Sequence, residues 1–237
     1  MIFQLPLKII QPFFLLAALL ICRQALAQPN PVTSNIEYQS VMSLPVDIGA
    51  GREVFFNCTK CHGTEGWGSY GGEYPQLAGQ HNSVIIKQLI DIRQGNRNNP
   101  LMLPIVAEMN DQDIVNVAGY IAVLKMNPDP GVGEAEDEVL IAIEKTYLQQ
   151  CSSCHGKTGA GDADKFYPLL QGQNYEYLLR QLKLIQAGKR KNSNPDMQTA
   201  ISKMSKETLA LLADYISRLE PVEQKVAPFG WENTDFQ

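Results

Sequence analysis

The sequence predicts an all-α protein made of two tandem copies of one small helical domain. Apolar residues recur at intervals of three and four through several long stretches, which is the period of a helix with one buried face. A pentapeptide of the form Cys-x-x-Cys-His occurs at residues 58–62 and again, 93 positions later, at residues 151–155. Between the two copies, the proline and glycine residues of 127–133 interrupt the helical pattern. The chain of 237 residues is long enough for two small domains joined by a linker.

Residues 1–27 have the pattern of a secretory signal peptide. Lys8 gives a basic start, residues 9–21 are mostly apolar, and residues 25–27 have the small-x-small form of a cleavage site. The apolar core is short for a membrane-spanning helix, although retention as an uncleaved anchor stays open as an alternative. We therefore expect an exported, periplasmic protein that begins at Gln28.

The first domain is predicted at residues 28–125 and begins with an arm. Residues 28–45 are polar, contain proline and show no clear period, so we expect them to be extended. Helical pattern follows in three stretches. Asn82 is the expected N-cap of the middle one. In chain order, the predicted elements are a short helix from Asp47 that closes with the cysteine pair, a loop at 63–79, a helix at 82–93, a loop at 96–103 and a helix at 110–125.

The linker is predicted at residues 126–140 and the second domain at residues 141–220. The acidic run 134–138 is expected to start the next helix, after which the pattern of the first domain restarts. Tyr-Pro runs at 74–80 and 167–173 are offset by the same 93 positions as the cysteines, and each ends in Gly-Gln. The sequence therefore contains an internal duplication.

The chain is predicted to end with a helix at 205–219 and a tail at 221–237. The tail contains Phe229 and Trp231, for which two interpretations are open: a docking element for a partner, or packing over the second domain. We favour packing over the second domain.

Each Cys-x-x-Cys-His motif is a haem-attachment signature. Two cysteines three positions apart lie on one face of a helical turn, so both thiols can bond to the vinyl groups of one haem. The following histidine supplies an axial iron ligand. We therefore predict two covalently bound haems c. The attachment residues are Cys58 and Cys61 in the first copy and Cys151 and Cys154 in the second, and the axial histidines are His62 and His155.

Two other uses of paired cysteines compete with haem attachment. A Cys-x-x-Cys pair alone could form a thioredoxin-like redox site, and two pairs could imitate a four-cysteine zinc site. In a zinc ribbon the two pairs lie roughly 15–20 residues apart, whereas here helical pattern fills a much longer gap. The histidine after each pair also favours haem. Cys22, the fifth cysteine, lies in the predicted signal, so no thiol of the mature chain is left over.

The second axial ligand decides between electron transfer and catalysis at an open iron. Two methionine pairs match across the repeat, Met102 with Met197 and Met109 with Met204. We favour Met102 and Met197, because each follows Asn-Pro-x in a loop that we expect to be extended and able to present a thioether. Met109 and Met204 end short apolar stretches, where methionine commonly packs in a core. The third histidine, His81, has an asparagine as its counterpart, so a surface role near a helix start is favoured.

The formal net charge is −5 at pH 7, which argues against nucleic-acid binding. The charge is uneven: residues 28–125 contain 6 basic and 9 acidic residues, whereas residues 141–220 contain 11 basic and 8 acidic residues. A basic cluster, Lys189, Arg190 and Lys191, lies near the second methionine loop. We expect it to dock an acidic redox partner, with an ordinary solvated charge run as the alternative.

With these motifs assembled, the sequence resembles the dihaem class I cytochromes c of the cytochrome c4 family. The resemblance covers residues 51–220 and rests on the doubled Cys-x-x-Cys-His-Gly, the doubled Tyr-Pro run, and the methionine before the last helix. It implies two tandem cytochrome c domains related by a pseudo-twofold axis, with haems close together at the domain interface. The paired Arg97 and Arg190 have two interpretations, hydrogen bonds to haem propionates or exposure to solvent. The iron ligands that the resemblance implies are His62 with Met102 and His155 with Met197.

The predicted function is the transfer of single electrons between respiratory or dehydrogenase partners. Ligation by histidine and methionine leaves no vacant position for a substrate. One alternative is the electron-accepting subunit of a periplasmic dehydrogenase. A second is a dihaem enzyme, a peroxidase or sulfur-compound oxidase, with one open haem, and a third is a non-haem thiol oxidoreductase. Membrane association is expected only through partners or an uncleaved signal anchor.

Overall fold

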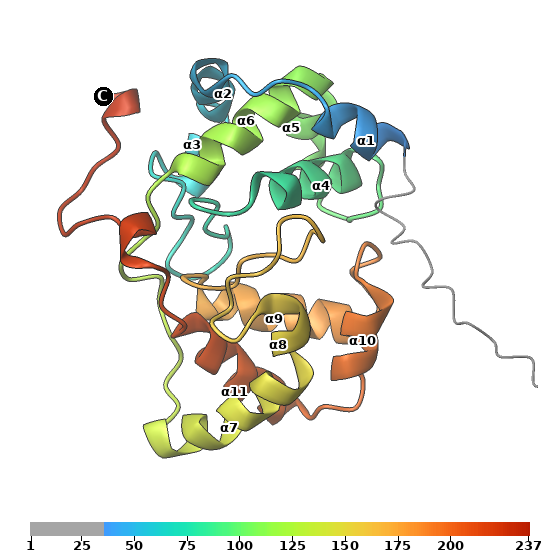
Figure 1. The fold of residues 1–237 in the computed structure, drawn as a ribbon, viewed down its shortest axis with the longest axis vertical. Helices are drawn as coiled ribbons and strands as arrows, with labels where there is room; N and C mark the ends of the chain where they lie inside the picture. Colours follow the sequence, from blue (N-terminus) through green and yellow to red (C-terminus); the bar gives the residue numbers. More distant parts are fainter. Residues whose placement is uncertain (1–35) are drawn as a thin grey trace, which may run out of the picture.

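The computed structural model describes residues 36–237, which fold as helices without a β-strand (Figure 1). The predicted signal peptide at 1–27 lies outside these residues. No helix in this part of the chain is long and apolar enough to cross a membrane. The all-α prediction is confirmed. The helices are α1 (Ile36–Met42), α2 (Ile48–Phe55), α3 (Thr59–His62), α4 (Asn82–Arg93), α5 (Leu103–Ala107), α6 (Asp111–Val123), α7 (Asp137–Gln150), α8 (Ser152–His155), α9 (Tyr175–Gln186), α10 (Pro195–Ile201) and α11 (Lys206–Ser217), followed by the short 3-10 helices η1 (Glu223–Lys225) and η2 (Thr234–Phe236).

The first half of the molecule packs α2 and α4 against α6. Its core contains Phe55, Ile90 and Ile114, which are fully buried. The backbones of α2 and α6 approach closely at Gly51, where a Cβ atom would lie 2.1 Å from the carbonyl oxygen of Asn116. Only glycine permits this crossing, because any side chain would overlap the backbone of α6.

The second half repeats this arrangement, with α7 to α11 corresponding to α2 to α6 (Figure 1). Its separate core contains Tyr147, Leu209 and Leu212. The side chains of Asn174 and Ser205 cap α9 and α11, and each accepts a hydrogen bond from the backbone N–H three residues further on. The predicted duplication therefore appears as two helical units with separate cores.

We expected residues 28–45 to form an extended arm. In the part of this arm that the structure describes, Ile36–Met42 instead form the helix α1. Tyr38 and Val41 lie three residues apart and are buried against α4 and α6. The Tyr38 hydroxyl also donates a hydrogen bond to Asp91 in α4. A helix of seven residues offers too few buried positions to show a period in the sequence.

Other helices begin or end a few residues away from their predicted positions. The first cysteine motif does not close the helix from Asp47, since α2 ends at Phe55 and α3 is a separate turn. Asn82 is the first residue of α4 and His81 is its N-cap, because the Asn82 side chain accepts from the neighbouring backbone N–H instead. The acidic run 134–138 starts α7, as expected, since Asp137 and Glu138 are the first two residues of that helix.

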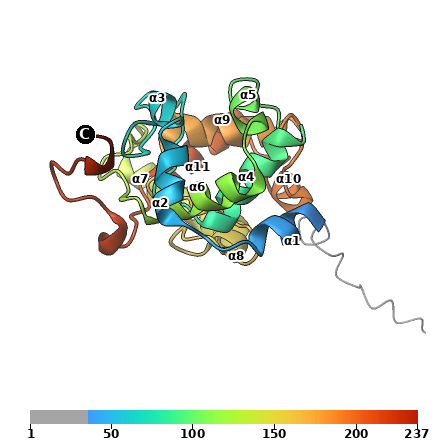
Figure 2. The same ribbon diagram turned by 90° about the horizontal axis from the view of Figure 1, so that it is seen from above.

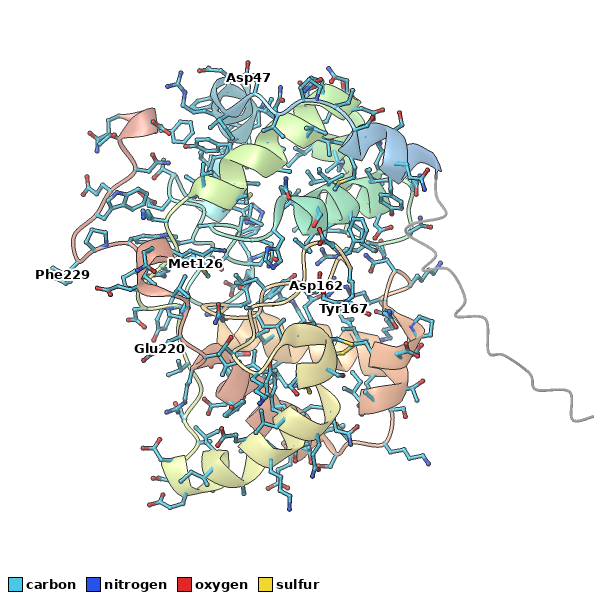
Figure 3. All side chains as sticks on the ribbon, in the orientation of Figure 1. Asp47, Met126, Asp162, Tyr167, Glu220 and Phe229 are labelled. Carbon is cyan, nitrogen blue, oxygen red and sulfur yellow. The ribbon has the colours of Figure 1, made fainter. Side chains whose placement is uncertain are left out.

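The tail at 221–237 folds back over the first half, whereas packing over the second half was expected (Figures 1 and 2). The rings of Trp231 and Trp67 have centroids 5.9 Å apart, and Phe236 packs against the core of the first half. Phe229, in contrast, projects from the molecule and is fully exposed (Figure 3). The two aromatic residues singled out in the sequence therefore lie in different environments.

Candidate functional site

A large cavity lies between the two halves and is lined by both cysteine motifs. Its volume is about 920 Å³. Tyr167, labelled in Figure 3, lies on its wall where the two halves meet. The structure thus brings together every residue that the sequence assigned to the two haem sites. The assigned residues that line this one cavity are Cys58, Cys61, His62, Met102, Cys151, Cys154, His155 and Met197.

Each histidine is held by a hydrogen bond that engages its Nδ1 atom. His62 Nδ1 lies 3.0 Å from the carbonyl oxygen of Pro75, and His155 Nδ1 lies 3.2 Å from that of Pro168. A carbonyl can only accept, so Nδ1 carries the proton and Nε2 keeps the lone pair that a metal needs. Burial also lowers the pKa of both imidazoles, which favours their neutral, ligating form.

Matching turns position the two histidines. The N–H of Gly68 donates to the carbonyl of His62 at 2.8 Å, and the N–H of Gly161 donates to that of His155 at 2.9 Å. Both glycines have positive φ, +76° and +72°. A Cβ atom at Gly68 would lie 2.2 Å from the carbonyl oxygen of Tyr74, so the loop can close over the motif only with glycine at this position.

None of the four cysteines of the motifs forms a disulfide within residues 36–237. Burial raises the pKa of Cys58 and of Cys151 to about 11. A redox-active thiol pair needs the opposite, a lowered pKa that supplies thiolate at neutral pH. Within residues 36–237, no three side chains of Cys, His, Asp or Glu gather closely enough to hold a metal ion. This chemistry fits thioether attachment of haem better than a dithiol redox site or a zinc site.

The favoured methionines are not in extended loops. Met102 is the N-cap of α5 with helical backbone angles, and Met197 lies in the first turn of α10. Pro195 starts α10, because its fixed φ and missing N–H suit the first position of a helix. Met109 also lines the cavity, but its counterpart Met204 does not. Met102 and Met197 are therefore the matched pair that lines the cavity in both halves.

Three arginines and a tyrosine meet on the cavity wall at the interface. Arg97 donates to the hydroxyl of Tyr177 at 3.0 Å, and Cζ of Arg180 lies 5.3 Å from the centroid of that ring. Arg190 donates to Gln88 Oε1 at 3.0 Å, and burial together with Arg97 lowers the pKa of Arg190 to about 10. Burial acts to raise the pKa of Tyr177, but the guanidinium groups outweigh it and lower this pKa. None of the ion pairs among the side chains that the structure describes involves these three arginines, so the wall suits the anionic carboxylates of a haem.

These positions refine two expectations from the sequence. Arg190 turns into the interface, so Lys189 and Lys191 are the exposed members of the basic cluster. His81 lies at the start of α4, as expected, and is also a half-buried contact between the halves, with Nε2 2.8 Å from the carbonyl oxygen of Ala160. Tyr177 of α9, which contacts Arg97 and Arg180, was not predicted as a site residue. No tyrosine occupies its counterpart in the first copy, so the repeat gave no signal for it.

Two family models match the chain, one in each half. The model described as "Cytochrome c" matches residues 48–125. The model described as "Cytochrome C oxidase, cbb3-type, subunit III" matches residues 140–216. Each match includes one Cys-x-x-Cys-His motif.

Similar proteins span both halves of the chain. Cytochrome c4 of Pseudomonas aeruginosa is 33% identical over 180 residues, covering 73% of this chain and 89% of that protein. The thiosulfate dehydrogenase electron acceptor of Stutzerimonas stutzeri is 33% identical over 182 residues, covering 72% and 82%. Among solved structures, reduced recombinant cytochrome c4 from Pseudomonas stutzeri aligns with a TM-score of 0.66 at 28% identity, covering 74% of this chain and 100% of that one.

Proposed function

Since this chain belongs to the cytochrome c4 family and is therefore a dihaem electron carrier rather than an enzyme, we propose which residues hold its two haems. The observation that supports the assignment is the cavity between the halves, which is lined by two complete and matching ligand sets. When bound, each haem iron accepts and releases one electron. The proposed set for the first haem is Cys58, Cys61, His62 and Met102, and that for the second is Cys151, Cys154, His155 and Met197.

In this proposal, each residue type has its own task. The cysteines would fix each haem to the chain, and the histidines would ligate iron through Nε2, because Nδ1 is hydrogen-bonded to a proline carbonyl. The methionines would supply the other ligand of each iron, which would exclude substrate and raise the reduction potential. Arg97, Arg180 and Arg190 would bind the propionates, whose charge would compensate these half-buried guanidinium groups.

We further propose that residues 28–125 and 141–220 act as two cytochrome c domains, joined by a linker at 126–140 and followed by the tail at 221–237. The separate hydrophobic cores of the two halves support this division. The signal pattern of residues 1–27 supports export to the periplasm.

The ligand assignment is tested by adding carbon monoxide to the fully reduced, haem-loaded protein. We expect no change in the optical spectrum, because a methionine occupies the sixth position of both irons. A spectrum that changes at one haem would contradict the methionine assigned to that haem. It would also show that this haem has a sixth position open to a small ligand.

Redox proteins are the partners of this carrier, and we propose that an acidic one docks at Lys189 and Lys191. Both lysines are exposed beside the second haem site. The double variant Lys189→Gln with Lys191→Gln should slow electron exchange with an acidic partner several-fold at low ionic strength and flatten its salt dependence, because charge complementarity speeds encounter. The matched control replaces Lys203 and Lys206, which are exposed but lie away from the cavity. Equal effects of the two double variants would contradict the docking site.

A relative named as the electron acceptor of thiosulfate dehydrogenase favours a second, narrower candidate. In this candidate, the chain is the electron-accepting subunit of a periplasmic dehydrogenase. Purification of the native protein at low ionic strength tests it. A dehydrogenase that co-purifies in a fixed ratio is the expected result, and a cytochrome that purifies alone would favour the free carrier.

A further inference from the structure

The Gly-Gln that ends each Tyr-Pro run has no role in the haem sites described so far. Its glutamines, Gln80 and Gln173, are offset by the same 93 positions as the cysteines. Gln173 is buried and Gln80 is half-buried, and both lie on the wall of the cavity between the halves. A pair of glutamines at matched interface positions needs a structural reason.

Each glutamine binds the backbone of the opposite half through both ends of its amide. Gln173 Oε1 accepts from the N–H of Gln76 at 3.1 Å, and its Nε2 donates to the carbonyl of the same residue at 2.9 Å. Gln80 Oε1 accepts from the N–H of Leu169 at 2.9 Å, and its Nε2 donates to that residue's carbonyl at 2.8 Å. Gln76 and Leu169 are themselves 93 positions apart, so the two clamps are reciprocal.

The clamped residues follow the two prolines whose carbonyls hold the histidines. The Pro75–Gln76 peptide accepts from His62 Nδ1 through its C=O and donates to Gln173 through its N–H. The Pro168–Leu169 peptide accepts from His155 in the same way and donates to Gln80. Each histidine is therefore joined through one peptide group to a side chain of the other half.

We propose that Gln173 is a positioning residue for the first haem and Gln80 for the second, so that each domain adjusts the reduction potential of the haem in the other domain. The proposal rests on the proposed ligation by His62 and His155. A peptide whose N–H is hydrogen-bonded has a more polarised, better accepting C=O. A better acceptor draws the Nδ1 proton and makes the imidazole a stronger donor to iron, which favours the oxidised state.

The test is a redox titration of the haem-loaded protein in which each haem is followed by its own NMR signals, assigned with Met102→Ala and Met197→Ala variants. Gln173→Met removes both hydrogen bonds of the clamp while keeping the length of the side chain. We expect it to raise the potential of the first haem by a roughly threefold change in its reduction equilibrium, ~28 mV at 59 mV per tenfold change. Gln80→Met should do the same to the second haem.

Two further variants separate this role from a loosened interface. Ser83→Ala removes one hydrogen bond between the halves, from Ser83 Oγ to the carbonyl of Ala163, without touching either clamped peptide. It should leave both potentials unchanged. Gln173→Glu keeps an acceptor for the N–H of Gln76 and makes it stronger, so the potential of the first haem should fall more than that of the second.

The proposal predicts that substitution of either glutamine shifts mainly the reduction potential of the haem in the other half. A shift confined to the haem of the substituted residue's own domain, an equal shift of both haems, or no shift would each overturn the proposal. Failure of the ligand assignment is recognised separately, since the unsubstituted protein would then lack the signals of two histidine- and methionine-ligated irons.

Discussion

Replacing Met102 by alanine is expected to open the first haem to carbon monoxide and to lower its reduction potential. The thioether stabilises reduced iron, and axial ligands span a range of ~0.8 V in haem proteins, so a fall of at least about 0.1 V is expected. The second haem keeps Met197 and should not change. Optical titration with carbon monoxide and a redox titration of the same sample measure both effects.

The matched control is Met109→Ala. Met109 lines the same cavity but packs against the core of the first half. Its truncation should cost about 2 kcal/mol of stability through lost packing and leave the haem closed to carbon monoxide. Met197→Ala and Met204→Ala form the corresponding pair in the second half, where both methionines pack against the core and only Met197 lines the cavity. Carbon monoxide binding in the Met109 variant, and none in the Met102 variant, would reverse the assignment.

The sequence predicted the helical class, the duplication and the residues that line the cavity, because these depend on local pattern. Cys-x-x-Cys-His spacing and a helical period are visible within a few turns. The N-cap at Ser205 lies where the last helix was predicted to start, and its side chain bonds the backbone only three residues away. Such features need no knowledge of the rest of the fold.

The features that were missed depend on contacts between distant segments. The contact of Trp231 with Trp67 joins the tail to the first loop, and no local signal distinguishes it from packing over the second domain. Arg190 was placed in an exposed basic cluster, with a haem propionate as its other possible partner, but its side chain crosses the interface to Gln88. Gln173 was visible as a repeated residue, yet its partner lies 97 positions away, so repetition alone could not show what it binds.

Gly68 and Gly95 are expected to differ in how much stability the protein loses when each is replaced by alanine. Both glycines have positive φ, +76° and +75°, so alanine at either position strains the backbone by about 1–2 kcal/mol. No heavy atom lies within 4 Å of a Cβ built at Gly95. A Cβ at Gly68 would lie 2.2 Å from the carbonyl oxygen of Tyr74 and 2.6 Å from that of Pro75. The two variants therefore share the same strain and differ in the overlap.

Gly68→Ala is accordingly expected to be much more destabilising than Gly95→Ala. We expect Gly95→Ala to lower the Tm by roughly 3 °C, which corresponds to about 1 kcal/mol in a chain of this size, and Gly68→Ala to lower it by roughly 10 °C. Thermal unfolding followed by haem absorbance and by circular dichroism measures both. Equal losses in the two variants would mean that the loop relaxes around the added methyl group.

The overlap at Gly68 also has a consequence for the haem site. The displaced Pro75 carbonyl is the acceptor for His62 Nδ1, so Gly68→Ala should disturb the first haem as well as the fold. Gly161→Ala should act in the same way on the second haem, because its Cβ would lie 2.4 Å from the carbonyl oxygen of Tyr167 and 2.6 Å from that of Pro168. A change in the NMR signals of the corresponding haem alone is expected in each variant. The loop that closes over each histidine would then be both a folding element and the support of an iron ligand, which is why glycine is required at the same place in both copies.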